Sequence, residues 1–254
     1  METIVRALRQ QHAELDVLLS GCAVADWNRP APDCPGWTLG DVVLHLEQTD
    51  RLVMASAEER FAETAAELTG PADGAPADID DFVERMVRHG RGLPPAELHQ
   101  RWWAGAEAVA AMFAACDPRR PLTWAVTPLP ARTLATTRLA ETWLHTVDVA
   151  AALGVAPEPG GRLWHVARLA WRTIPYAFAR AGLEPPAGPV AVRLTAPDGT
   201  AWDFEPDQPA ATVVSGPARD FCLVAGRRLE AAKSALTADG PDAATVLTLL
   251  RTYA

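Results

Sequence analysis

One stretch of the sequence, residues 131–153, carries four polar side chains at the spacing of a helix. They are three, four and three positions apart: Arg138, Glu141, His145 and Asp148. In a helix these side chains share one face, while apolar residues on the other side provide a packing surface. Glu and His also pair on solvated helix faces, so this helix by itself fits a polar surface stripe equally well.

A second candidate, His45, lies in the apolar run of residues 42–46. A His among apolar neighbours is most often a core or boundary residue, but facing helices of a bundle can also build metal sites in the core. His45, Glu141 and His145 together would supply two imidazoles and a carboxylate. Such a set leaves coordination positions open, as in catalytic zinc and non-haem iron sites. Asp148, one turn after His145, would then accept the second N–H of that imidazole.

The segments around these residues resemble a known family. The sequence CPGWT at residues 34–38, followed by DVVLHL at residues 41–46, is similar to the amino-terminal signature of the mycothiol-dependent maleylpyruvate isomerase family, a branch of the DinB-like bundles. The stretch RLAETWLHTVDVAAALG at residues 138–154 resembles the second signature of that family. Residues 216–227 are more loosely similar to its carboxy-terminal domain, so the resemblance covers most of the chain.

The resemblance implies a chemistry for the site. In that family the His of the first motif and the Glu and His of the second bind a divalent metal, usually taken to be zinc. Carried over, the metal ligands are His45, Glu141 and His145, which would act in catalysis through the bound metal. The implied cosubstrate is mycothiol, whose sulfur becomes a thiolate when it is coordinated at neutral pH. Addition of that thiolate to an electrophilic substrate gives cis-trans isomerisation or S-transfer.

Two arginines are candidates for binding substrate or thiol. Arg138 and Arg227 could hold a substrate carboxylate, because a guanidinium binds carboxylates bidentately. A plain salt-bridge role is the alternative for each. Two other functions also stay open for the chain: a metal-dependent hydrolase-type enzyme that uses metal-bound water, and a non-catalytic small-ligand-binding protein.

Other reactive or aromatic side chains receive a structural interpretation. Cys34 lies in a Pro-Gly loop and could be a redox or accessory group, but no pattern indicates a charged partner for it, which favours an inert thiol. Trp37 and Trp143, one in each motif, are expected to be core residues or pocket walls. The remaining histidines lack partners at a useful spacing and are assigned no role: His12, His89, His99 and His165.

Helices must position these side chains. Apolar residues at helical periods predict helices over residues 2–22, 38–61, 79–89, 95–116 and 131–153. Thr38 with Asp41 predicts a capping box at the start of the second helix, and Gly154 predicts the end of the last. These helices predict a mainly α fold with an up-down bundle over residues 1–155. The resemblance implies that it is a DinB-like four-helix bundle that binds the metal.

A small α+β domain is predicted over residues 156–254. Residues 155–161 form a Pro/Gly linker, and Asp198-Gly199 is a hairpin turn. The predicted strands are residues 190–194, 201–205 and 211–214, and the predicted helices are residues 163–181, 217–229 and 242–253. The break in character after Gly154 divides the chain into an all-α part and this smaller unit.

Composition and charge limit the kinds of molecule that the protein is expected to bind. The 254 residues carry a net charge of −9, which argues against nucleic-acid binding. No apolar run approaches the roughly 18 residues that span a membrane. Charged residues throughout the first 19 positions argue against a signal peptide, so a cytoplasmic protein is expected. The four cysteines form no CxxC pair, and free thiols are expected. The expected partners are a small-molecule electrophile and a thiol, bound by a monomer or homodimer.

Overall fold

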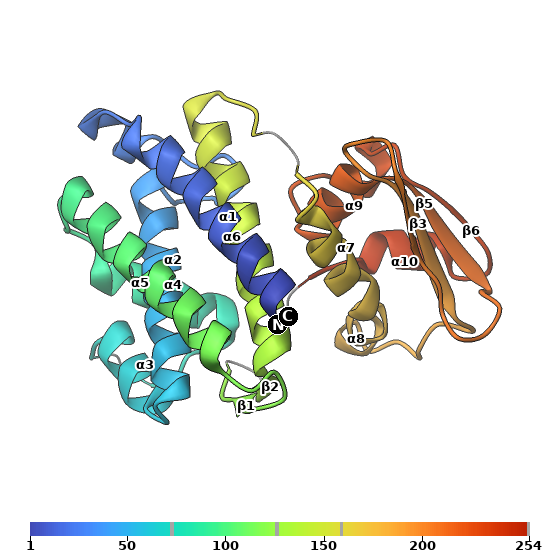
Figure 1. The fold of residues 1–254 in the computed structure, drawn as a ribbon, viewed down its shortest axis with the longest axis horizontal. Helices are drawn as coiled ribbons and strands as arrows, with labels where there is room; N and C mark the ends of the chain where they lie inside the picture. Colours follow the sequence, from blue (N-terminus) through green and yellow to red (C-terminus); the bar gives the residue numbers. More distant parts are fainter. Residues whose placement is uncertain (72–73, 125–126, 158–159, 253–254) are drawn as a thin grey trace. The chain divides into compact units, whose positions relative to one another are not determined.

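The structure, a computed structural model, describes residues 1–71, 74–124, 127–157 and 160–252. Contacts along the chain divide it into two compact units, Met1–Pro157 and Glu158–Ala254. The first unit is helical, and the second combines helices with a small sheet (Figure 1). Both the predicted helical bundle and the α+β character of the remainder are confirmed. Within the described residues, no helix is long and apolar enough to cross a membrane.

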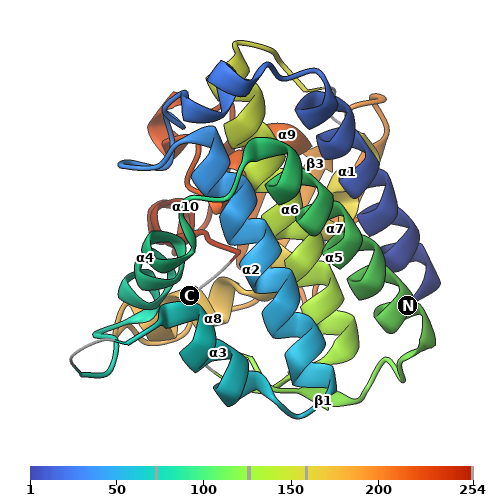
Figure 2. The same cartoon turned by 90° about the vertical axis from the view of Figure 1, so that its left-hand side faces the viewer.

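Four long helices form the first unit: α1 (Glu2–Ser20), α2 (Leu39–Ala57), α5 (Pro95–Ala115) and α6 (Ala131–Leu153). Figures 1 and 2 show α1 and α6 running in one direction and α2 and α5 in the other. Side-chain contacts agree with this. Gln11 bonds Thr146, whereas His99 near the start of α5 contacts Asp16 near the end of α1. The directions along the chain are therefore up, down, down and up, so the helices do not alternate as they would in the predicted up-down bundle.

Two shorter helices, α3 (Phe61–Thr69) and α4 (Ile79–Gly90), make this order possible. They return the chain to the end of the bundle at which α2 begins, so that α5 runs parallel to α2. Arg91, just after α4, binds both carboxylate oxygens of Asp41 at 2.9 and 3.1 Å. Such a bidentate pair fixes orientation as well as distance and holds the end of α4 against the first turn of α2.

The capping box at the start of α2 is present as predicted. Thr38 Oγ1 accepts from the Asp41 backbone N–H at 3.2 Å, and Asp41 Oδ2 accepts from the Thr38 backbone N–H at 2.9 Å. Burial acts to raise the pKa of Asp41, but the hydrogen bonds from Arg91 and Thr38 outweigh it and lower that pKa. A charged carboxylate therefore stands at the helix start, where the macrodipole favours it. Gly154 ends α6 with φ +72°, the left-handed conformation expected of its cap.

The bundle core is apolar and lies between α2 and the neighbouring helices. It is built from fully buried aliphatic and aromatic side chains, including Leu15, Leu39, Val42, Val43, Leu46, Leu98, Trp102 and Val149. His45 lies on α2 within this apolar sequence run. Packing around it fixes the position of its ring, since interiors are as dense as organic crystals.

Two predicted helices are each divided in the structure. The second ends at Ala57, and α3 is a separate helix, because Glu59 adopts a φ of +60° that a continuous helix does not allow. The predicted helix over residues 163–181 is two helices, α7 (Leu163–Arg172) and α8 (Ile174–Arg180). Pro175 stands in the first turn of α8, where its missing N–H is tolerated.

The second unit contains a four-stranded sheet in the order β4-β3-β5-β6. Its strands are β3 (Val190–Thr195), β4 (Ala201–Phe204), β5 (Thr212–Pro217) and β6 (Thr237–Asp239). β3 pairs antiparallel with β4 and parallel with β5, and β5 pairs antiparallel with β6. Figure 1 shows α7, α9 (Ala218–Ala225) and α10 (Ala243–Leu249) on the same side of this sheet. The three-residue β6 was not predicted.

Other short elements were also not predicted. The strands β1 (Pro121–Leu122) and β2 (Leu129–Pro130) form a two-stranded ladder just before α6. Two 3₁₀ helices cover Val24–Asn28 and Ala231–Lys233. Elements of two to five residues are too short to show a repeating pattern of apolar residues, so periodicity cannot reveal them.

Candidate metal centre

The two halves of the candidate site come from antiparallel neighbours. His45 lies near the start of α2, and Glu141 and His145 lie one turn apart on α6. Glu141 Oε2 is 3.6 Å from His45 Nε2 and 3.6 Å from His145 Nε2. The two imidazole centroids are 4.9 Å apart, with ring planes at 74°. The structure thus brings together three side chains that the sequence separates; we call them the triad.

The spacing of the triad fits a divalent ion. All three ligand atoms lie within 4.8 Å of one another. Metal bonds of about 2.0–2.1 Å in a tetrahedral site hold neighbouring ligand atoms about 3.4 Å apart. The 3.6 Å separations are close to that value and longer than hydrogen bonds. The His45 and His145 side chains are 7% and 9% exposed, whereas Glu141 is 22% exposed, so the centre is most accessible beside its carboxylate.

The ionisation of the triad follows from burial and mutual contact. Burial lowers the pKa of His45 to about 4, against a smaller opposing effect of Glu141. Burial acts to raise the pKa of Glu141, but the nearby imidazoles of His145 and His45 outweigh it and hold that pKa well below its usual value. A neutral imidazole on α2 therefore faces a charged carboxylate on α6. Both are protonation states that bind metals, whereas His145 must release its Nε2 proton when an ion binds.

His145 is fixed from its other side by Asp148. The fully buried Asp148 places Oδ2 at 2.8 Å from His145 Nδ1, so Nδ1 carries the hydrogen and Nε2 faces Glu141. Burial acts to lower the pKa of His145, but Asp148, Cys34 and Glu141 outweigh it and raise that pKa well above its usual value. A carboxylate behind a His ligand is the arrangement that orients metal-binding imidazoles.

Cys34 was expected to lack a charged partner, but the structure gives it one. Its Sγ donates to Asp148 Oδ2 at 3.2 Å. Cys34, Asp148 and His145 form a second group of possible ligand atoms within 4.8 Å of one another. The partner lies 114 positions further along the chain, which is why no local pattern indicates the contact.

Trp37 forms one wall of the centre, one of the two roles expected of it. Its ring lies 5.4 Å from that of His45 and 6.5 Å from that of His145, nearly parallel to the second. The indole N–H donates to Glu84 Oε2 on α4 at 3.0 Å. Trp37 is therefore held in place by a residue outside the triad. Trp143 is buried in the bundle.

The two candidate arginines lie in different settings. Arg138 is 1% exposed and binds Asp50 of α2, with Nε at 3.2 Å and Nη2 at 3.1 Å from Oδ1. Burial raises the pKa of Asp50 to about 6, against the opposing effect of Arg138. Arg227 is exposed and follows α9 in the second unit with a φ of +60°. Arg138 thus connects α2 to α6 inside the bundle, and Arg227 presents its guanidinium to solvent.

The remaining histidines lie outside the triad, and two of them have contacts that the sequence did not indicate. His99 Nε2 lies 2.7 Å from Asp16 Oδ1. His12 is buried with its ring edge-on to Trp102, at 6.2 Å between centroids. Both contacts join α1 to α5, so we assign these side chains to helix packing.

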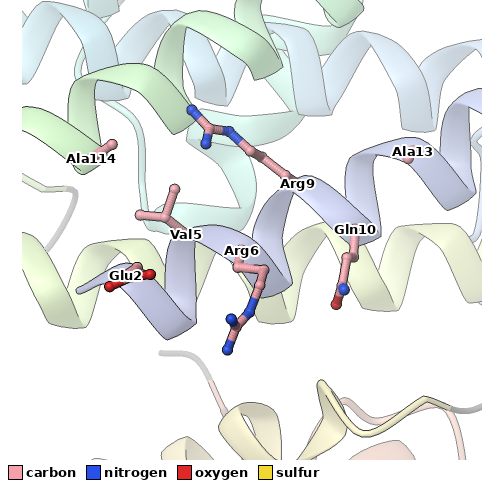
Figure 3. Close-up of a pocket in the computed structure, with 7 residues that line it drawn as sticks. All are labelled: Glu2, Val5, Arg6, Arg9, Gln10, Ala13 and Ala114. Carbon is pink, nitrogen blue, oxygen red and sulfur yellow. The ribbon is translucent and has the colours of Figure 1, made fainter.

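A hollow on the bundle surface lies away from the triad. Figure 3 shows its lining: Glu2, Val5, Arg6, Arg9, Gln10 and Ala13 of α1, with Ala114 of α5. Arg9 projects to the opposite side of α1 from Arg6 and Gln10 in this view. Its polar groups therefore do not converge on one ligand, and the hollow contains no residue of the triad.

Comparisons with known proteins find similarity over the bundle and over most of the chain. The profile of the mycothiol maleylpyruvate isomerase N-terminal domain matches residues 8–150, which include the whole triad. Two uncharacterized proteins, from two strains of Mycobacterium tuberculosis, are each 35% identical over 252 residues, covering 98% of this chain and 95% of the relative.

Two crystal structures share the fold. One is the mycothiol-dependent maleylpyruvate isomerase, with a TM-score of 0.61 and 18% identity over 95% of both chains. The other is a His-to-Ala mutant of the enzyme of that name, with a TM-score of 0.60 and 17% identity over 95% of both chains. At these identities the likeness establishes a common fold.

Proposed function

The chain belongs to the mycothiol maleylpyruvate isomerase family, and on that premise we propose that it is a metal-dependent enzyme of thiol chemistry. His45, Glu141 and His145 bind a divalent ion, Zn²⁺ in the first instance. The thiol is mycothiol, and it adds to a small electrophilic substrate. The observation that carries this proposal is the placement of Glu141 Oε2 at 3.6 Å from both imidazole Nε2 atoms in a partly closed site.

The donor set suits zinc. Two imidazoles and one carboxylate occupy three positions and leave at least one open, the pattern of catalytic rather than structural zinc sites. A borderline ion such as Zn²⁺ also accepts a thiolate in the open position, whereas Mg²⁺ and Ca²⁺ prefer oxygen ligands. When bound there, the ion would supply the positive charge that keeps a thiol ionised at neutral pH.

The protein's own residues prepare the site for that chemistry. Asp148 holds the His145 ring so that Nε2 points to the common centre. Glu141 contributes the one negative charge of the triad, which leaves a net positive centre for an anionic sulfur. Trp37 covers the two imidazoles and keeps water from that face. These residues orient the ligands and exclude water, and both effects strengthen electrostatic interactions inside the site.

The reaction proposed is addition to a conjugated double bond. A thiolate that adds to one carbon converts a fixed double bond into a rotatable single bond. Elimination of the thiolate after rotation gives cis-trans isomerisation, and retention of the new C–S bond gives S-transfer. Arg138 is bound to Asp50 and serves to hold α2 against α6 below the triad. Arg227, with its exposed guanidinium, is the candidate for a substrate carboxylate.

Elemental analysis of the purified protein tests the metal proposal. We expect about one equivalent of a divalent metal in the native chain and less than about a tenth in His45→Ala, because loss of one ligand strongly weakens binding. His99→Ala is the control, since His99 pairs with Asp16 outside the triad. A metal-free native protein, or full occupancy in His45→Ala, would overturn the proposal.

Thiol binding tests the proposal that mycothiol is activated at the triad. Calorimetric titration with mycothiol should give binding to the metal-loaded protein and none to His45→Ala. Binding of equal strength to both would contradict activation of the thiol at the triad. A metal-loaded protein that binds no thiol would instead favour water as the nucleophile, the hydrolase-type alternative.

A further inference from the structure

Cys34 lies in a solvent-exposed loop, and its sulfur contacts the buried Asp148. The loop is closed by backbone hydrogen bonds from Ala31 N to Trp37 O and from Trp37 N to Cys34 O. Pro32, Asp33, Pro35 and Gly36 are exposed, and Cys34 itself is partly exposed. A Cβ placed on Gly36 would meet no atom within 4 Å. The loop around Cys34 is therefore open to solvent on its outer side.

The second observation is the triad itself. Its convergent ligand atoms point to a bound group at this place, independently of any contact that Cys34 makes. His145 belongs to both groups of ligand atoms, with Nε2 toward Glu141 and Nδ1 toward Asp148. Cys34 Sγ contacts the same Asp148 oxygen at 3.2 Å. The protein's own thiol thus lies behind the imidazole whose front faces the metal position.

The other three cysteines, all within the described residues, lie in different surroundings. Cys222 is fully buried, and burial raises its pKa strongly. Burial also raises the pKa of Cys22, whose Sγ donates to Leu18 O near the end of α1. Cys116 follows α5 at the opposite end of the bundle from Cys34. Only Cys34 belongs to a group of metal-ligating side chains.

We propose that Cys34 is a site of reversible S-thiolation, at which its sulfur forms a mixed disulfide with a low-molecular-weight thiol. This rests on the proposed function, which brings such a thiol to the triad. The co-reactant is the disulfide form of that thiol. Sγ attacks one sulfur of the disulfide, an S–S bond forms, and the other half leaves as a thiolate that takes up the proton of Cys34. The two electrons lost by Cys34 reduce the leaving sulfur, so no further oxidant is needed.

The adduct would change the site directly. It removes the Sγ–H donor from Asp148 and adds bulk beside Trp37. Asp148 would lose the Cys34 contact that helps to fix its carboxylate behind His145. A thiol reductant reverses the bond. S-thiolation would therefore switch the enzyme off when the disulfide form of its own cosubstrate accumulates.

Intact-mass analysis with 2-hydroxyethyl disulfide, a small neutral probe, tests the proposal on the full chain. We expect the first adduct on Cys34, formed about tenfold faster than on Cys116, since access and local environment govern thiol exchange. Cys34→Ser should lose that first adduct, and Cys116→Ser should keep it. Dithiothreitol should restore the original mass. Equal labelling of Cys34 and Cys116, or no adduct on Cys34, would overturn the proposal.

A second reagent separates this proposal from the metal proposal. Mycothiol disulfide should label Cys34 at least about fivefold faster in the native chain than in His45→Ala, because thiol binding at the triad raises the local concentration. The small probe should label both chains alike, which shows that the variant is folded around Cys34. If the native chain holds no metal, the proposed function fails, while labelling by the small probe still decides whether Cys34 is the preferred thiol. Equal rates with mycothiol disulfide in both chains would contradict delivery through the triad.

Discussion

At the residue scale, His145 connects the features of the candidate centre because both of its ring nitrogens are used. Nε2 faces Glu141 and, across it, His45, while Nδ1 is committed to Asp148. An imidazole held in this way cannot rotate to present the wrong nitrogen. The carboxylate behind the ring therefore matters almost as much as the ligand itself.

Asp148→Asn tests that role. The amide keeps the size of the carboxylate but loses its charge, so we expect the affinity for Zn²⁺ to fall about 10–100-fold. Competition with a chelating dye measures the affinity. Asp33→Asn, a matched change on the exposed loop beside Cys34, should leave it unaltered. Equal affinities for Asp148→Asn and native protein would contradict the orienting role.

His12 predicts a dependence of stability on pH that is separate from the metal. Burial, with a smaller contribution from Arg138, lowers its pKa from 6.5 to about 3. Below pH 6.5 the unfolded chain binds a proton that the folded chain excludes, so stability is lost as the pH falls toward 3. The slope approaches about 1.4 kcal/mol per pH unit within that window.

Urea titrations between pH 4 and 7 of His12→Leu and the native chain, both metal-free, measure this slope. His12→Leu should flatten the dependence by about one proton, whatever its effect on absolute stability. His89→Gln is the control, since His89 is exposed. An unchanged slope in His12→Leu would show that His12 is protonated in the fold.

The sequence identified side chains better than it identified their partners. Spacing within one helix was sufficient to predict that Glu141, His145 and Asp148 share a face. His45 was named from its apolar surroundings and the family motif together. The contacts of Cys34 with Asp148 and of Arg138 with Asp50 join residues 114 and 88 positions apart. Periodicity within one helix cannot indicate such contacts, because they form only when distant parts of the chain pack together.

At the scale of elements, the centre depends on the α2–α6 interface. The capping box of α2 and the glycine cap of α6 were predictable because each is a local pattern with a steric or hydrogen-bonding cause. Helix directions were not, because they depend on the return of the chain through α3 and α4. The separate α3 was missed since nothing in the sequence marks the positive φ of Glu59. Below the triad, the buried pair of Arg138 and Asp50 joins the two helices.

Removal of one partner of that pair should be far more damaging than removal of both. Arg138→Met leaves the Asp50 carboxylate buried without its cation, and we expect a loss of about 3–5 kcal/mol in the free energy of unfolding. Arg138→Met with Asp50→Leu should recover most of it. Urea denaturation measures both variants.

An exposed pair provides the comparison. Arg101 and Glu97 on α5 form an ion pair with side chains 51% and 44% exposed, so Arg101→Met should cost less than about 1 kcal/mol. Similar losses for Arg101→Met and Arg138→Met would show that Arg138 contributes no more than a surface charge.

At the scale of the whole molecule, the metal centre and the candidate substrate arginine belong to different compact units. Every residue of the triad, with Asp148, Cys34 and Trp37, lies within Met1–Pro157, whereas Arg227 lies in the second unit. The boundary after Gly154 could be predicted from the Pro/Gly linker and from the alternating apolar and polar residues of the strands that follow. The parallel pairing of β3 with β5 could not be predicted, because these strands are not consecutive in the sequence.

Expression of residues 1–157 alone tests whether the first unit forms the metal centre without the second. We expect the fragment to bind about one equivalent of zinc, because all the proposed ligands and their supporting contacts are internal to it. A fragment that folds but binds no zinc would show that the second unit is needed to form the centre.

The order of the helices also sets when the centre can form. His45 is synthesised about a hundred residues before Glu141 and His145, with α3, α4 and α5 between them. On a growing chain the ion therefore cannot be captured by all three ligands until the last helix of the bundle has been made. A bound ion would close a loop of that length, and cross-links of this size contribute about 4–5 kcal/mol by restricting the unfolded chain. The proposed ion would thus complete the assembly of the bundle, and its loss would weaken the packing of α2 against α6, which the buried pair of Arg138 and Asp50 would still join.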